Sequence, residues 1–110
     1  MITTIIIRTR FVAFHCWPEA PDVVAFLRNK HRHEFWVEVE LYVEHTNRDL
    51  EFFICKDYID SYISNYFTEQ YLENMSCEGM ATALLVQLKL PVKSVSVFED
   101  GENGAKVEHN

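Results

Sequence analysis

Two segments of alternating apolar and polar residues constrain this chain most strongly. In the segment from Thr3 to His15, one side carries Ile, Phe, Ala and a final His at every second position. The segment from His31 to Val43 alternates in the same way, with acids on its other side. A period of two is typical of a β-strand with one buried face, because successive side chains point to opposite sides. The sequence therefore predicts two long strands that contribute to one apolar layer.

The spacing of apolar residues becomes helical after Asp57. This period predicts an amphipathic helix with an aromatic stripe that ends near Phe67, and a second helix that follows an N-cap at Ser76 and is stopped by Pro91. The stripe is interpreted as core rather than as a cofactor box, because an apolar stripe facing a sheet is the usual form of such a helix.

Strand-like alternation returns in residues 92–99 and is followed by a turn and a last short strand, which together read as a hairpin. Residues 23–29, after a loop with two prolines, are compatible with one short helical turn. The predicted order is strand, strand, helix, helix, strand, strand. It indicates an α+β fold that forms one domain over residues 1–110.

Three histidines fall at the ends of the two long strands, with His15 closing the first and His31 and His33 opening the second. Side chains two residues apart on a strand share a face at a separation of about 6.5–7 Å, so His31 and His33 can reach one ion. A neighbouring strand can supply the third imidazole, and three nitrogen ligands with one open position are typical of catalytic zinc. The alternative is that these are ordinary surface or core histidines that fall together by coincidence.

The charge balance narrows the choice of partners. The chain has 10 Lys and Arg against 17 Asp and Glu, a net charge of −7, which argues against nucleic acid or an anionic membrane. The three cysteines are odd in number and have no C-x-x-C spacing, so a reducing, cytoplasmic location is expected. No targeting or membrane-spanning segment is recognised.

Four short motifs resemble the 6-pyruvoyltetrahydropterin synthase and 6-carboxytetrahydropterin synthase family. Phe11–His15 is similar to the family's aromatic-x-Ala-x-His strand, and His31–Phe35 is similar to its His-x-His strand. Ser76–Glu78 resembles the Thr-x-Glu that opens the second helix, and Val97–Asp100 resembles the late Val-x-Glu-Thr strand. The resemblance extends over nearly the whole chain.

This resemblance implies the tunnelling fold, in which an antiparallel four-stranded sheet of ββααββ order carries two helices on one face. It implies homo-oligomeric barrels, trimers or hexamers, with active sites between subunits. It also implies a carbon-oxygen lyase that uses zinc, held here by His15, His31 and His33, to act on a reduced pterin.

The resemblance further implies that Glu99 anchors the pterin and that Glu78 and Ser76 also belong to the pterin-binding site. A carboxylate can accept two parallel hydrogen bonds from the N–H edge of a 2-amino-4-oxo ring. Glu78 has an alternative explanation, because acids in the first helical turn are favoured by the helix dipole.

The departures from the family pattern concern the catalytic base. Leu27 stands four residues before His31, where the family has a cysteine, and Thr68 and Glu69 stand where it has an Asp-His pair. Glu69 remains a candidate carboxylate base. Cys77 is a second candidate, because a helix N-terminus lowers the pKa of a thiol.

Three functional hypotheses therefore stay open. The first is a zinc-dependent lyase on a substrate like dihydroneopterin triphosphate, with a rearranged base. The second is a zinc protein that binds a pterin or purine or performs another reaction. The third is a structural oligomer in which the histidines are vestigial.

Overall fold

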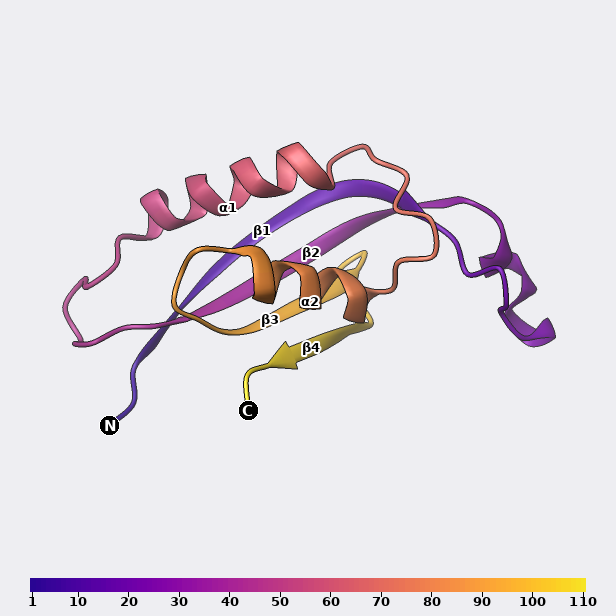
Figure 1. The fold of residues 1–110 in the computed structure, drawn as a ribbon. Coiled ribbons are helices and arrows are strands. Elements are labelled where there is room, and N and C mark those ends of the chain that lie inside the picture. Colours follow the sequence, from indigo (N-terminus) through magenta and orange to yellow (C-terminus); the bar gives the residue numbers. More distant parts are fainter.

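A computed structural model describes all 110 residues of the chain (Figure 1). The element order confirms the sequence prediction, and the short helical turn expected at residues 23–29 is a 3₁₀ helix in the loop between the first two strands. The elements are β1 (Thr4–His15), the 3₁₀ helix (Asp22–Arg28), β2 (His31–Tyr42), α1 (Phe52–Tyr66), α2 (Cys77–Gln87), β3 (Val92–Glu99) and β4 (Gly104–Glu108).

The four strands form one antiparallel sheet in the order β1-β2-β3-β4, and both α-helices lie over one face of it (Figure 1). Helix α1 packs along β1, and α2 packs on β3 and β4. Neighbouring strands in this order follow each other in the chain or are joined by the helix pair. The connections β1-β2 and β3-β4 both turn at the same end of the sheet, where functional residues are predicted.

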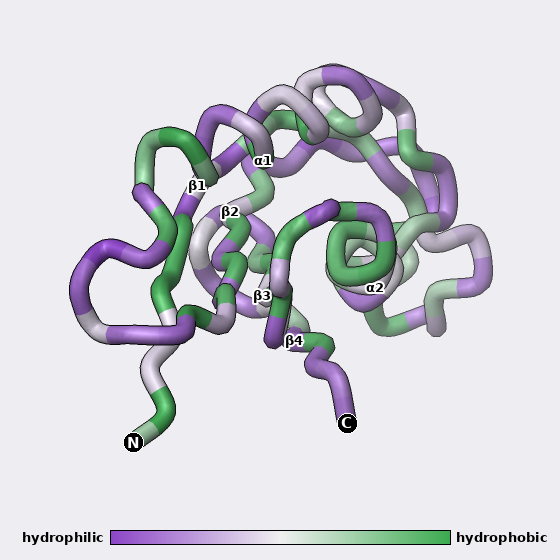
Figure 2. The backbone as a smooth tube through the Cα atoms, turned by 60° about the vertical axis from the view of Figure 1, so that its left-hand side comes forward, coloured by the Kyte–Doolittle hydropathy of each residue, from purple (hydrophilic) through white to green (hydrophobic).

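One core of 20 buried residues fills the space between the sheet and the helices. Phe35, Val37 and Val39 of β2 contribute its sheet side, and Ile59 and Leu84 contribute from the two helices. Each fully buried side chain of this size stabilises the fold by about 1.5–3 kcal/mol relative to an exposed one. Figure 2 shows how the apolar residues dominate α2, whereas the C-terminal tail is hydrophilic.

Helix α1 begins at Phe52, five residues before the position that the apolar period predicts. The side chain of Glu51 caps this end by accepting hydrogen bonds from the backbone N–H groups of Phe53 and Ile54, at 3.0 and 3.1 Å. Glutamate is not among the usual N-cap residues, and the first-turn side chains are exposed, so neither the capping signal nor the apolar stripe marks this start.

Helix α2 follows the predicted cap, because Ser76 Oγ accepts the N–H of Gly79 at 3.1 Å. It ends at Gln87, and Leu88 closes the last turn with a backbone hydrogen bond to Leu84. Pro91 lies beyond this end and starts the approach to β3. The predicted bounds of α2 are confirmed at its N-terminal end.

The connection between α1 and α2 is joined to the outer edge of β1. The backbone N–H of Glu69 donates to Val12 at 2.7 Å, Phe14 exchanges hydrogen bonds with Gln70 and Leu72, and Cys16 donates to Glu73. These bonds hold the segment that leads to α2 beside the last residues of β1. They thereby bring the start of α2 next to His15.

Candidate metal centre

His15, His31 and His33 converge on the helix-covered face at one end of the sheet. In the strand register His15 lies opposite His31, and His33 lies opposite Ala13, so all three imidazoles share that face. One ligand atom from each histidine lies within 4.8 Å of the other two. The convergence that strand spacing predicts is therefore present.

Each of the three rings has its Nδ1 atom next to a hydrogen-bond acceptor. His15 Nδ1 lies 2.8 Å from the carbonyl oxygen of Met75, and His31 Nδ1 lies 2.8 Å from that of Asn29. His33 Nδ1 lies 2.7 Å from Asp100 Oδ2. An Nδ1–H that donates to an acceptor leaves the lone pair of a neutral imidazole on Nε2.

The three Nε2 atoms are buried and have no hydrogen-bond partner. Buried polar atoms without a partner are rare, because each one loses its hydration without replacement. Burial is also the largest influence on the pKa of His15; it lowers this pKa and so favours the neutral ring. Three buried imidazole nitrogens that converge and lack a partner are a donor set for a transition metal, and the residues present fit a metal ion such as zinc.

Glu99 at the end of β3 extends its carboxylate into the same cluster. Its Oε2 atom lies 3.2 Å from His15 Nε2 and 3.6 Å from His33 Nε2. The strand register explains this position, because Glu99 lies opposite Phe35, two residues beyond His33 on the same face of β2. The residue that the family resemblance implies as a pterin anchor thus lies against the imidazoles.

A cavity of ≈ 380 Å³ adjoins the cluster, and its walls include Ser76, Cys77, Glu78 and Glu99. This volume is within the range of small-molecule sites. All three residues implied in pterin binding therefore line one space with His15.

Burial raises the pKa of Cys77 to about 12, and the nearby carboxylates of Glu99 and Glu78 act in the same direction. This direction is opposite to the one that the position at a helix N-terminus predicts. Desolvation and two like-signed neighbours outweigh the helix dipole here, so the thiol is protonated at neutral pH.

Leu27 and Cys16 also line the cavity, whereas Glu69 does not. The leucine occupies the place where the resemblance implies a catalytic thiol, and it offers no titratable group. Cys16 Sγ lies 3.1 Å from the hydroxyl of Tyr71. Glu69 has a backbone φ of 60° and lies on the outer edge of β1, away from this cavity of its own chain.

Sequence reasoning did not find the hydrogen-bond acceptors that orient the three imidazole rings. Two of them, at Met75 and Asn29, are backbone carbonyls, which leave no signal in residue identity. Asp100 had a usable signal, since it is an acid directly after Glu99 in the motif that carries the resemblance.

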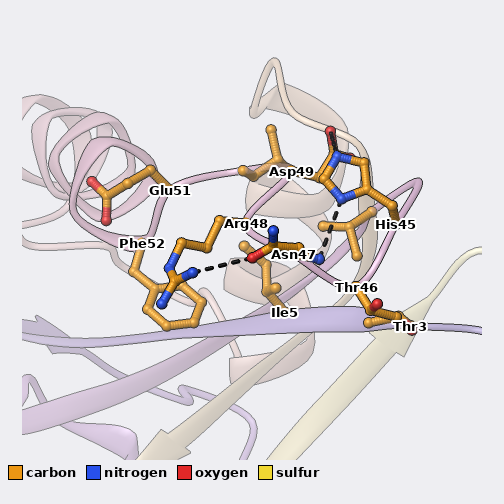
Figure 3. Close-up of a pocket in the computed structure, with 11 residues that line it drawn as sticks. Thr3, Ile5, His45, Thr46, Asn47, Arg48, Asp49, Glu51 and Phe52 are labelled. Carbon is orange, nitrogen blue, oxygen red and sulfur yellow. Dashed lines mark hydrogen bonds and ion pairs between the residues drawn. The ribbon is translucent and has the colours of Figure 1, made fainter.

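A second cavity, of ≈ 390 Å³, lies at the opposite end of the sheet between the start of β1 and the loop that leads into α1 (Figure 3). Its polar side chains bond mainly within the loop: the N–H of Asn47 donates to His45 Nδ1 at 3.2 Å, and Arg48 donates to Asn47 Oδ1 at 3.1 Å. It contains a single histidine and no group of converging unpartnered nitrogens, so the candidate site is the triad end.

No protein-family model and no curated protein sequence matches this chain. Among solved structures, an uncharacterized protein from Wolinella succinogenes is similar with a TM-score of 0.82 and 14% sequence identity, covering 100% of this chain and 99% of its own. The 6-pyruvoyl tetrahydropterin synthase of Caenorhabditis elegans is similar with a TM-score of 0.75 and 15% identity, covering 100% and 97%.

None of the helices is both long and apolar enough to cross a membrane.

The structural neighbours confirm the resemblance at the level of the fold, over essentially the full length of both chains. The chain therefore has the α+β fold of 6-pyruvoyl tetrahydropterin synthase, with a histidine group at one end of the sheet that can hold a metal ion.

Proposed function

We propose that this chain is a zinc-dependent protein, similar to the pterin synthases, that binds a reduced pterin next to its histidine cluster. The observation that carries the proposal is the convergence of three buried, unpartnered Nε2 atoms beside a cavity lined by Glu99. The fold shared with a 6-pyruvoyl tetrahydropterin synthase supports the choice of ligand.

In this proposal His15, His31 and His33 hold zinc through Nε2. Bound zinc supplies Lewis-acid chemistry, by which it polarises the oxygens of a substrate. Glu99 accepts hydrogen bonds from the N–H edge of the ring, and Glu78 lines the same cavity. Ser76 uses a lone pair of its hydroxyl to cap α2, so its hydroxyl proton is free to donate to the ligand.

Two versions of this function differ in chemistry. A carbon-oxygen lyase acting on a substrate like dihydroneopterin triphosphate needs a base near the ligand, for which Glu69 and Cys77 are the proposed candidates. Leu27 in the cavity wall and the raised pKa of Cys77 favour the other version, in which the protein binds a pterin or purine or performs another reaction. Glu69 can serve the cavity only from another copy of the chain or after a rearrangement of its loop.

We also propose a homo-oligomer, a trimer or hexamer. The outer edge of β1 is covered by the chain itself only near Val12 and Phe14, and β1 pairs with no other strand than β2. On the other side of the sheet, β4 pairs only with β3. Two edges with free backbone donors and acceptors can pair with another copy, which would join the sheets of several chains. Sedimentation equilibrium of the purified protein tests this assembly.

The first test is elemental analysis of zinc in protein purified without a histidine tag, followed by incubation of the same sample with dihydroneopterin triphosphate. Stoichiometric zinc with product formation supports the lyase. Zinc with ligand binding but without turnover supports the binding version. Protein that neither retains nor takes up zinc would leave the structural oligomer as the remaining hypothesis.

A further inference from the structure

We propose that Glu99 is a fourth ligand to the metal when no small molecule is bound, so that three imidazoles and one carboxylate close the centre. The inference rests on the proposed function only in requiring that a metal binds the triad. It gives the Glu99 carboxylate two alternative partners, the metal or the pterin, which it cannot bind at the same time.

The distances from Glu99 Oε2 to two of the three imidazoles match those between ligands of one ion. Tetrahedral zinc with bonds of about 2.0–2.2 Å separates neighbouring ligand atoms by about 3.3–3.6 Å. Oε2 lies 3.2 Å from His15 Nε2 and 3.6 Å from His33 Nε2. These separations are longer than a short charged hydrogen bond, which measures about 2.7–2.9 Å.

The electrostatics around Glu99 Oε2 and the two Nε2 atoms also favour a bound cation. The Nδ1 atoms of His15 and His33 face Met75 O and Asp100 Oδ2, which places the lone pairs of both rings at Nε2. Glu99 therefore directs an anionic oxygen toward two lone pairs, and neither Nε2 atom has a hydrogen-bond partner. A divalent cation between them replaces this repulsion by attraction to all three atoms.

Backbone hydrogen bonds fix the position of the main chain at Glu99. Its N–H donates to the carbonyl of Asn103 at 2.8 Å across the β3-β4 turn, and the next residue, Asp100, donates its N–H to Glu34 of β2 at 2.7 Å. The side chain itself is 34% exposed, so it borders solvent as well as the imidazoles. A fixed backbone with a partly exposed side chain allows the carboxylate to reach the metal and also to leave it.

One consequence follows for ligand entry. A carboxylate oxygen that binds the metal is not available for two parallel hydrogen bonds to the N–H edge of a pterin. A pterin that takes Glu99 as its anchor must draw it away from the metal, and this movement opens the fourth coordination position. Glu99 would then keep the metal closed until the ligand arrives.

Cobalt substitution tests this inference without any assay of activity. The tag-free protein is reconstituted with Co²⁺ in the absence of pterin, and the visible absorption and the affinity for Co²⁺ are measured for wild type, Glu99→Gln and Glu102→Gln. We expect the wild type to give the intense bands of a four-coordinate centre. Glu99→Gln should change these bands and bind Co²⁺ at least about 10-fold more weakly, because even the loss of a residue that only orients a ligand costs about 10–100-fold in metal affinity. Glu102→Gln, in the exposed β3-β4 turn, should match the wild type.

An unchanged spectrum and affinity in Glu99→Gln would overturn the inference while leaving the three-histidine site intact. A wild type that binds no Co²⁺ and no zinc would overturn it together with the proposed function. Since a variant can fail to fold, a crystal structure of the zinc-loaded wild type provides a second measurement. A Glu99 oxygen about 2.0–2.2 Å from the ion supports the inference, and a water molecule in that position with Glu99 turned away overturns it.

Discussion

The imidazole of His33 is held by Asp100, with Nδ1 and Oδ2 separated by 2.7 Å. The other oxygen of the same carboxylate accepts the backbone N–H of Glu34 at 3.0 Å. The hydrogen bond from His33 is the largest cause that lowers the pKa of Asp100, and the one from Glu34 adds to it. A carboxylate on the far nitrogen of a metal-binding imidazole fixes its tautomer and orientation and makes it a stronger ligand.

Asp100→Asn is therefore expected to weaken metal affinity by about 10–100-fold without removing any of the three imidazoles. Asparagine tolerates the left-handed backbone of this residue, whose φ is 54°, so the turn should be kept. Competition with a chelator measures the affinity. Asp49→Asn, on the far loop beside His45, is the matched control and should bind metal as the wild type does. Equal affinity in both variants would contradict the role of Asp100.

His33→Ala removes one of three imidazole donors and is expected to reduce bound zinc from about one ion per chain to a small fraction of that. Elemental analysis after gel filtration measures the ratio. His45→Ala removes a histidine from the loop at the opposite end of the sheet and should leave the zinc content unchanged. Zinc retained equally by both variants would remove the triad as the metal site.

Leu84→Ala opens a cavity in the centre of the core, because this side chain of α2 is fully buried. We expect a loss of about 2–5 kcal/mol in the free energy of unfolding, from lost transfer energy and the space left behind. Val86→Ala on the exposed side of the same helix should change that free energy by no more than about 0.5 kcal/mol. Urea denaturation of the two variants under identical conditions gives the comparison, and similar losses in both would contradict the packing described for α2.

Glu40 predicts a pH dependence of stability. Its carboxylate accepts hydrogen bonds from Thr4 at 2.7 Å and Ser94 at 2.9 Å, and Lys93 lies 3.6 Å away. The hydrogen bond from Thr4 contributes most to lowering the pKa of Glu40 from its ordinary value of 4.5. A carboxyl with a lowered folded-state pKa stabilises the fold fully above its unfolded-state value, and this stability is lost as the pH falls through the folded-state value.

The difference in unfolding free energy between wild type and Glu40→Gln should therefore be largest near neutral pH and should shrink as the pH falls below 4.5. Denaturation curves of both proteins at a series of pH values measure it. A difference that stays constant across this range would show that the ionised carboxylate contributes nothing through these bonds.

Period-two alternation was sufficient to predict both long strands and the common face of His15, His31 and His33, because strand geometry leaves no freedom in which side a residue takes. The same reasoning could not find the start of α1, where Glu51 acts as an unusual cap. Nor could it give the pKa of Cys77, which depends on burial beside two carboxylates brought in by tertiary structure. The position of Cys77 at a helix N-terminus predicts only the effect of the helix dipole on its pKa. Burial and the two carboxylates outweigh that effect.

The position of Glu99 illustrates a further limit. Sequence places this residue at the end of a strand and the family resemblance implies a role for it, but only the register with β2 brings its carboxylate to the imidazoles. The carbonyls of Met75 and Asn29 are hidden from sequence for a related reason, since every residue has a carbonyl and only the fold selects two of them.

The three rings are each tied to a different connection: His15 to the segment before α2, His31 to the residues before β2, and His33 to the β3-β4 turn. An ion that fixes the rings would therefore also fasten three loops that are far apart along the chain. Metal binding would therefore slow the amide hydrogen exchange of residues at this end of the sheet, because local unfolding there becomes rarer. The loop before α1, at the far end, would keep its rate of amide exchange.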